Sequence, residues 1–449
     1  MDIAEKYRPR LHFSPASGWM NDPNGLIFVD GRYHLFYQHD PFSVSHGTMH
    51  WGHASSENLV DWVEHAIALR PDAHGACWSG SAIETADGAI KLFYTAHRQM
   101  ADGRDVESQC LVHADRSLQT FVADPGNPVL ANPGLEVFRD PKVIWHAESA
   151  QWVMLVTMGE KIGFYGSTNL VDWEPLSTFG ERDGCHNGSP WECPDLVRLA
   201  APDGSAHWVL IVGIAGGAYA GGSGTQYFIG SFDGRTFSNA NPPSTILWLD
   251  HGSDCYAAQT FFDIQPGRTM ALAWASNWLY ARATPTTIFR GVMTLPREIR
   301  LVSDAARLRL AMHVPTAVHR RFACYRPDVV NGTYRWEALV RLEPGEEQAV
   351  ALFGEAAPHL TLMRDTHTRG RIRSTRGTLH AIPDFAHDYE VEIDWPEGGL
   401  DLTLYVDQGV VELCADRGRV WITNLFFPEE PDGALSITVR ETARLKDVA

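Results

Sequence analysis

Three acidic residues stand in short segments in which a proline closely follows the acid. Asp22 lies in GWMNDPNG, Asp140 in VFRDPKV and Glu192 in SPWECPDLV, and an apolar run typical of a strand follows each of them. Because proline fixes the local backbone, we expect each carboxylate to be held in one orientation. Taken singly, each segment is equally typical of a turn, a strand-edge ion pair or a helix N-cap.

Two carboxylates in a partly dry pocket are the minimum equipment for cleaving a glycosidic bond. One stays ionised and attacks the anomeric carbon, while the other gives its proton to the leaving oxygen. A third carboxylate beside an arginine, as Asp140 is beside Arg139, can oppose the positive charge of an oxocarbenium-like transition state. Such chemistry requires a fold that brings three distant segments together.

Short strand-like runs fill the first 300 residues, and one local pattern recurs among them. Runs such as LIFVDGRYHLFYQ, QWVMLVTM and TQYFIGSF, broken by Gly, Pro and Asp, predict antiparallel strands. ENLVDWVEH (57–65) returns as TNLVDWEPL (168–176), and GSFDGRTFS (230–238) is a weaker relative. The repeat predicts the outer edges of successive propeller blades, whose inner strands would bring the acids to a common axis.

The pattern of apolar and polar residues changes after Pro296. REIRLVSDAARLRLAMHVP predicts a crossover with some helical character, and later runs such as YEVEIDW and LDLTLYVDQGVVELC alternate cleanly without acid turns. This alternation predicts a β-sandwich that serves mainly as support. The predicted domains are a propeller over 1–305, a linker over 306–315 and a sandwich over 316–449.

Charge and cysteine usage narrow the class of protein. A formal net charge of −18 disfavours nucleic acid and anionic membrane surfaces as partners, and no run reaches the length of a membrane span. Seven scattered cysteines without a CxxC pair predict neither a zinc site nor a disulfide framework. Together with a start that lacks an apolar leader, they predict a cytoplasmic location. No cofactor or metal is implied. The expected partner is a small neutral molecule, and the sequence does not indicate the oligomeric state of the protein.

The acid segments also carry a family resemblance. WMNDPNG, FRDP and ECPDLV, in this order, resemble the signatures of glycoside hydrolase family 32, the invertases, inulinases and levanases. MHWGHASSENLVDW, CWSGSAI, DHGSDCYAAQTFF and RGVMTLPRE extend the resemblance through the first domain, and LYVDQGVVELCADRGRVWITNLFF carries it into the second. The resemblance implies an all-β fold in which a five-bladed β-propeller is followed by a C-terminal β-sandwich.

The resemblance also implies roles for individual residues. Asp22 is the nucleophile that forms a covalent fructosyl–enzyme, Glu192 is the general acid that later becomes the base, and Asp140 stabilises the transition state. Trp191 and Cys193 are expected to give Glu192 an apolar setting that suits a proton donor, whereas Tyr256 and Gln259 are expected to be structural. The substrate-binding residues implied are Asn21, Gln38, Trp51, Trp78, Ser79, Arg139, Asp254 and Trp274, with Arg139 also keeping Asp140 charged.

Two positions depart from the family pattern. His46 stands where many relatives carry Trp, five residues before the WGH tripeptide, and Asp40 stands where relatives commonly have Asn. We expect a looser contact with the leaving group and treat His46 as a candidate substrate contact.

The expected activity is release of terminal β-D-fructofuranosyl residues from sucrose and short fructo-oligosaccharides, with retention of configuration. The Asp22 and Glu192 carboxyls should then lie about 5–5.5 Å apart. A transfructosylase and an exo-acting levan or inulin hydrolase use the same three acids and remain alternatives. A sugar-binding protein without catalysis is disfavoured, because all three acids are present.

Overall fold

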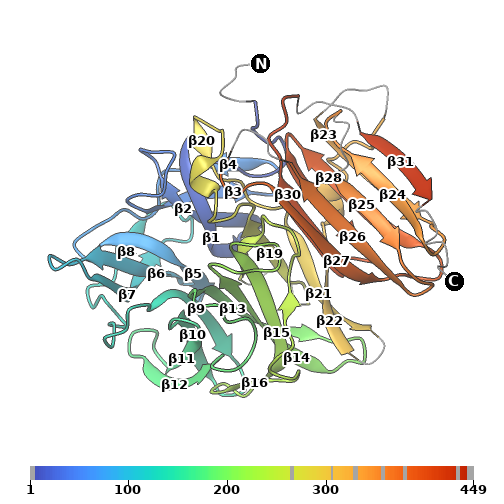
Figure 1. Cartoon of the computed structure of the whole chain (residues 1–449). Helices are drawn as coiled ribbons and strands as arrows, with labels where there is room; N and C mark the ends of the chain where they lie inside the picture. The colour runs from blue at the N-terminus through green and yellow to red at the C-terminus, as the bar shows by residue number, and fades with distance from the viewer. Residues whose placement is uncertain are drawn as a thin grey trace.

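The computed structural model describes residues 6–262, 267–304, 307–326, 332–354, 359–377, 382–430 and 435–441. Its regular structure is almost entirely antiparallel β-sheet. Five sheets are arranged as a ring, and two further sheets lie beside it at the C-terminal end of the chain (Figure 1). The predicted β-propeller followed by a β-sandwich is therefore confirmed.

Each blade of the propeller is one sheet built from consecutive strands. Blade I holds β1 (Gly18–Val29), β2 (Arg32–Asp40), β3 (His50–Ser56) and β4 (Trp62–Glu64), and blade II holds β5 (Ala76–Glu84), β6 (Ile90–Gln99), β7 (Asp105–Ala114) and β8 (Phe121–Ala123). Blade III holds β9 (Arg139–His146), β10 (Gln151–Thr157), β11 (Ile162–Ser167) and β12 (Glu174–Phe179). Blade IV holds β13 (Trp191–Ala200), β14 (Ala206–Ile214), β15 (Gly224–Phe232), β16 (Phe237–Asn239) and the short β17 (Leu247–Trp248). Blade V holds β18 (Tyr256–Thr260), β19 (Met270–Trp274), β21 (Arg297–Asp304) and β22 (Arg307–His313).

The first strand of every blade lies on the inside of the ring. The strands β1, β5, β9, β13 and β18 contact one another in this order, and β18 contacts β1 again. The short strand β20 (Phe289–Arg290), which follows a 3₁₀ turn (Ala281–Ala283), pairs in parallel with the start of β1. The end of the propeller sequence thus joins the beginning, which closes the ring.

The recurring sequence pattern builds equivalent turns in two blades. In blade I the Asn58 side chain accepts hydrogen bonds from the N–H groups of Val60 and Asp61, and Leu59 takes a left-handed φ of 67°. In blade III Asn169 repeats both bonds, with Leu170 at φ 68°. Both turns join the third and fourth strands of a blade, and the weaker relative at 230–238 occupies the same place in blade IV. The predicted outer blade edges are confirmed.

The sandwich consists of two sheets. One holds β23 (Thr333–Val340), β28 (Leu400–Asp407), β29 (Val410–Ala415) and β30 (Val420–Leu425). The other holds β24 (Glu346–Ala351), β25 (Leu360–Arg364), β26 (Arg369–Arg376), β27 (His387–Asp394) and β31 (Ser436–Glu441).

The segment predicted as a linker belongs largely to the propeller. Arg307–His313 forms β22, which pairs with β21 in a hairpin at the outer edge of blade V. The alternating residues of RLRLAMH suit a half-buried edge strand, so the helical character expected between 297 and 315 is wrong. The only α-helix in the described part of the chain, α1 (Thr316–His319), follows it.

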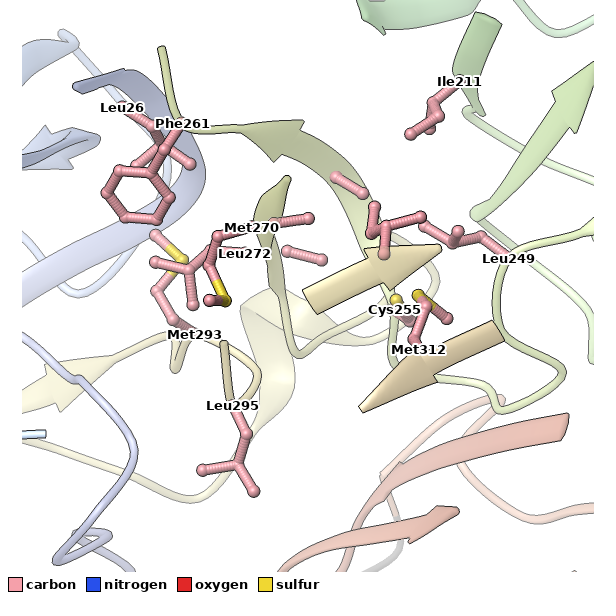
Figure 2. Packing of buried hydrophobic residues seen from close by; sticks show 14 of the residues in the cluster. Leu26, Ile211, Leu249, Cys255, Phe261, Met270, Leu272, Met293, Leu295 and Met312 are labelled. Carbon is pink, nitrogen blue, oxygen red and sulfur yellow. The ribbon is translucent and has the colours of Figure 1, made fainter. Parts of the chain in front are cut away.

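The propeller and the sandwich share one hydrophobic core. This cluster gathers Phe13, Met270 and Met312 from the propeller side and Phe322, Tyr405 and Trp421 from the C-terminal side. Figure 2 shows Met270, Leu272 and Met293 packed together, with Met312 beside Cys255 at the base of blade V. Burial of apolar surface on both sides fixes the two domains against each other.

Buried charges reinforce the same joint. His12, ahead of blade I, lies 2.9 Å from Asp407 through Nδ1 and 3.3 Å from Glu412 through Nε2. Burial by itself lowers the pKa of His12, but hydrogen bonds to Asp407 and Glu412 outweigh it and raise the pKa to about 9. The imidazole is therefore charged in the folded protein at neutral pH.

A His12→Gln variant tests this charge. The raised folded-state pKa of His12 contributes about 3 kcal/mol of stability that is fully present below pH 6.5 and lost as the pH rises to 9. The melting temperature of the wild type should fall over this range, and that part of the fall should be missing in His12→Gln. The control is His367→Gln, at an exposed position, whose melting temperature should depend on pH as that of the wild type does. An unchanged pH dependence in His12→Gln would contradict the assignment.

Candidate active site

The three acids converge at the axis of the propeller. Asp22 lies on β1, Asp140 on β9 and Glu192 on β13, and all three line one cavity of about 1090 Å³. The thiol of Cys193 lies 3.3 Å from Asp22 Oδ2 and 3.7 Å from Asp140 Oδ2. The structure therefore brings together the three segments that the sequence keeps far apart.

The proline that follows each acid explains how the strands turn these side chains toward the axis. The ladder between β1 and β2 shifts register between Met20 and Pro23, and that between β13 and β14 shifts between Glu192 and Asp195. Proline has no N–H for a ladder bond, so a bulge forms where it stands and re-aims its neighbours.

Left-handed backbone accompanies these bulges. Asp140 has φ 63°, Cys193 has φ 50° and Ala257 on β18 has φ 53°. Such a conformation costs a residue other than glycine about 1–3 kcal/mol and persists only where the surrounding structure imposes it. Asp140 is one of the three acids, Cys193 follows Glu192 and Ala257 follows Tyr256, so the strained backbone gathers at the site, which is typical of a functional site.

One of the two carboxylate oxygens of Asp22 makes no hydrogen bond to the described part of the chain. Its Oδ2 accepts a 2.6 Å hydrogen bond from the Ser79 hydroxyl, whereas the buried Oδ1 has no hydrogen-bond partner among the described residues. Burial raises the pKa of Asp22, the Ser79 hydroxyl opposes this by lowering it, and the nearby Glu192 charge raises it further. An oriented carboxylate with one unpartnered oxygen is suited to attack a carbon atom.

Arg139 pairs with different partners from those predicted. Its Nη2 lies 2.8 Å from Glu192 Oε1, and its Nη1 lies 2.9 Å from Glu107 Oε1. Asp140 instead accepts the N–H of Cys193 at 2.9 Å. Burial raises the pKa of Asp140, and the Arg139 charge only partly opposes this. Both residues line the cavity, but the Arg139 guanidinium is held by the two glutamates, so it forms no ion pair with Asp140.

Glu192 has a polar setting, which corrects the apolar one expected. Arg139 holds Oε1, and the hydroxyl of Tyr256 donates to Oε2. Trp191 packs inside blade IV, and Cys193 faces the other two acids. The Glu192 side chain keeps 19% of its surface exposed, whereas Asp22 and Asp140 are buried. Glu192 is therefore the most exposed of the three acids.

Most of the predicted binding residues line the cavity. Gln38 is held by a 3.0 Å bond from Nε2 to the Cys77 carbonyl, and Trp78 stacks on His97 with ring centroids 3.8 Å apart. Burial lowers the pKa of His46 to about 4, so its ring is neutral where it meets the edges of Trp78 and Trp278. The predicted residues in the lining are Asn21, Gln38, Trp78, Ser79, Arg139 and the candidate His46.

Three predicted binding residues do not reach the cavity. Trp51 is buried behind Trp78, whose carbonyl accepts a 2.9 Å bond from the indole. Trp274 is buried with its ring 4.8 Å from that of Trp278. Asp254 is fully buried and pairs at 2.6 Å with Arg376 of the sandwich. These residues support the cavity wall or the domain joint, since none is exposed to a ligand.

The structure adds residues that sequence reasoning missed. Tyr256, expected to be structural, touches Glu192, and its place at the start of the innermost strand of blade V is the signal that was available. Glu107 has no local signal, because only folding brings it to Arg139. Trp278, Arg282 and the segments 103–107 and 132–137 complete the cavity wall, apart from Pro133.

Comparison with known proteins identifies the family. The family model for the glycosyl hydrolases family 32 N-terminal domain matches residues 12–312, and the model for the family's C-terminal domain matches 337–449. The chain belongs to glycoside hydrolase family 32. It is thus a glycoside hydrolase, and the site at the propeller axis is its candidate active site.

Similar proteins in this family differ in their named activities. The levanase of Bacillus subtilis is 35% identical over 96% of this chain and 68% of its own length. The invertase of Schizosaccharomyces pombe is 36% identical over 66% of this chain and 53% of its own. The crystal structure of exo-inulinase from Aspergillus awamori superposes with a TM-score of 0.83 at 29% identity, covering 97% of this chain and 96% of that one.

The described residues contain no group of three or more His, Cys, Asp or Glu side chains arranged to hold a metal ion. No helix among them is long and apolar enough to cross a bilayer.

Replacing Ser79 by Ala tests the electrostatics around Asp22. The Ser79 hydroxyl lowers the pKa of Asp22, so its loss should raise that pKa and move the acidic limb of kcat/KM to higher pH. The measurement is a pH–rate profile on the enzyme's glycoside substrate. Ser167→Ala, in an outer turn of blade III, is the control and should leave the limb in place. If the acidic limb of kcat/KM lies at the same pH in Ser79→Ala as in the wild type, the ionisation of Asp22 does not determine it.

Proposed function

We propose that the protein is a retaining hydrolase that releases terminal β-D-fructofuranosyl residues from sucrose and short fructo-oligosaccharides. The observation that carries the proposal is the arrangement of two carboxylates in one cavity, with an unpartnered oxygen on Asp22 and an exposed position for Glu192. The named activities of the levanase, exo-inulinase and invertase relatives support the choice of a fructosyl substrate.

The reaction proceeds in two steps. Asp22 Oδ1 attacks the anomeric carbon of the fructosyl unit while Glu192 gives its proton to the leaving oxygen, so the glycosidic bond breaks as the ester bond to Asp22 forms. Glu192 then takes a proton from water, whose oxygen replaces Asp22 at the same carbon. Asp140, on the cavity floor, faces the positive charge of the transition state.

A second candidate function, exo-acting hydrolysis of levan or inulin, is favoured by the size of the cavity. A volume of about 1090 Å³ lies just above the ~300–1,000 Å³ range of small-molecule sites, so more than one sugar unit fits. Transfer of the fructosyl unit to another sugar uses the same acids. The predicted cytoplasmic location remains part of the proposal and is supported by seven free cysteines, which suit a reducing compartment.

The substrate test uses sucrose, kestose, inulin and levan with assays for fructose and glucose. We expect fructose from sucrose and kestose, and turnover of the polymers would favour the second candidate. Products longer than the donor at high sucrose would indicate transfer. Absence of fructose from all four would overturn the proposal.

Asp22→Asn tests the nucleophile. We expect kcat to fall by about 10⁴-fold, because the amide cannot form the covalent intermediate. The control is Asp61→Asn in the exposed outer turn of blade I, which should retain wild-type rates. Turnover retained by Asp22→Asn would refute the assignment.

The stereochemistry of the product gives an independent test. Two displacements at one carbon retain its configuration, so the first fructose released should be the β-furanose anomer. NMR spectra recorded in the first minutes of hydrolysis will distinguish it from the α-anomer. Initial α-fructose would require a direct displacement by water and a wider carboxyl separation than the predicted 5–5.5 Å.

A further inference from the structure

One guanidinium of the sandwich reaches into blade V. Arg376, at the end of β26, is almost fully buried, and its Nη1 lies 2.6 Å from Asp254 Oδ2. Its Nη2 donates to the Tyr280 hydroxyl at 2.9 Å, and that hydroxyl donates to Asp254 Oδ1 at 2.5 Å. The three side chains form a closed ring of charge-assisted bonds across the domain joint.

Both blade V partners of Arg376 lie two residues from groups at the cavity. Asp254 precedes Tyr256, whose hydroxyl donates to Glu192. Tyr280 follows Trp278 and precedes Arg282, and both of these line the cavity. The sandwich therefore holds the two segments of blade V that border the active site.

Its own sheet holds Tyr256 through one pair of residues only. Tyr256 pairs with Trp274, but the ladder between β18 and β19 shifts register before the next pair at Gln259, and Ala257 has φ 53°. Where a ladder is interrupted in this way, the direction of a side chain depends on what anchors the neighbouring residues.

Asp254, two residues before Tyr256, is hydrogen-bonded to the backbone of the sandwich. The Asp254 N–H donates to the Thr423 carbonyl at 3.0 Å, and the Leu425 N–H donates to Asp254 Oδ2 at 2.8 Å. Cys255, the residue between Asp254 and Tyr256, is buried beside Met312 in the shared core (Figure 2). Backbone, charge and packing thus all hold this segment.

We propose that Arg376 is a positioning residue for the acid–base group Glu192. It acts through Asp254 and Tyr256, so the sandwich helps to orient a side chain of the active site. Glu192 has one donor group on each oxygen, Arg139 on Oε1 and Tyr256 on Oε2. Displacing Tyr256 frees Oε2 and lets the carboxylate rotate away from the leaving oxygen. The inference rests on the proposed role of Glu192.

Arg376→Lys is the first test. Lysine keeps the charge but cannot bind Asp254 and Tyr280 together. We expect kcat to fall between about 2-fold and 30-fold with a smaller change in KM, the range of coupling through packed networks. The matched control is Arg297→Lys, which loses an equally buried guanidinium between Asp250 and Glu412 at the same joint. An equal fall in kcat in the control would overturn the proposal, because it would make the effect one of general destabilisation.

A double-mutant cycle tests whether Arg376 acts through Tyr256. In a Tyr256→Phe background, Arg376→Lys should cause no further fall in kcat, because the contact it supports is already gone. Independent, multiplying effects of the two substitutions would overturn the proposed route. If Arg376→Lys does not fold, Tyr280→Phe loosens the same ring more gently and takes its place in the cycle.

A crystal structure of Arg376→Lys gives a result that does not depend on turnover. We expect the Tyr256 hydroxyl to leave hydrogen-bonding distance of Glu192. An unchanged Tyr256–Glu192 contact would overturn the inference whatever the activity. Failure of the wild type to release fructose from any fructoside would instead refute the proposed function, so the two failures are distinguishable.

Discussion

The site depends on holding several carboxylates close together, with Arg139 paired to two of them. Arg139 pairs with Glu107 and Glu192, and the aspartates on the cavity floor receive no ion pair. Two unit charges 4 Å apart repel by about 4 kcal/mol at the effective dielectric of a protein surface. Burial and this repulsion raise the pKa values of Asp22 and Asp140. No isolated hairpin would keep such groups in place, so the closed ring of sheets has to impose their positions.

The ring imposes them at a local cost. Bulges and left-handed residues beside the acids give up ladder bonds and strain the backbone at the axis. The core shared by propeller and sandwich offsets this cost, since it buries large side chains such as Trp421 and Met312 from both sides. The sandwich is thus more than the passive support that its clean alternation suggested.

Sequence reasoning succeeded where local chemistry carries the information. The acid–proline segments located Asp22, Asp140 and Glu192, and the Asn-Leu-Val-Asp-Trp repeat located equivalent outer turns in blades I and III. It failed where a partner comes from a distant segment. The pairing of Arg139 with Glu192, the contact of Tyr256 and the burial of Asp254 under Arg376 all depend on which strands meet after folding. The family resemblance placed Asp254 among the substrate-binding residues, and the sequence does not reveal whether an acid in a loop faces a ligand or another domain.

The pairing of β20 with β1 has a consequence for biosynthesis. The Gly18 N–H, at the edge of the strand that carries Asp22, donates to the carbonyl of Ile288. During translation the N-terminal part emerges first, so this edge waits unpaired until almost the entire propeller has left the ribosome. Asp22 therefore cannot acquire its final surroundings on a nascent chain, and a prematurely terminated polypeptide exposes an open strand edge that is prone to association.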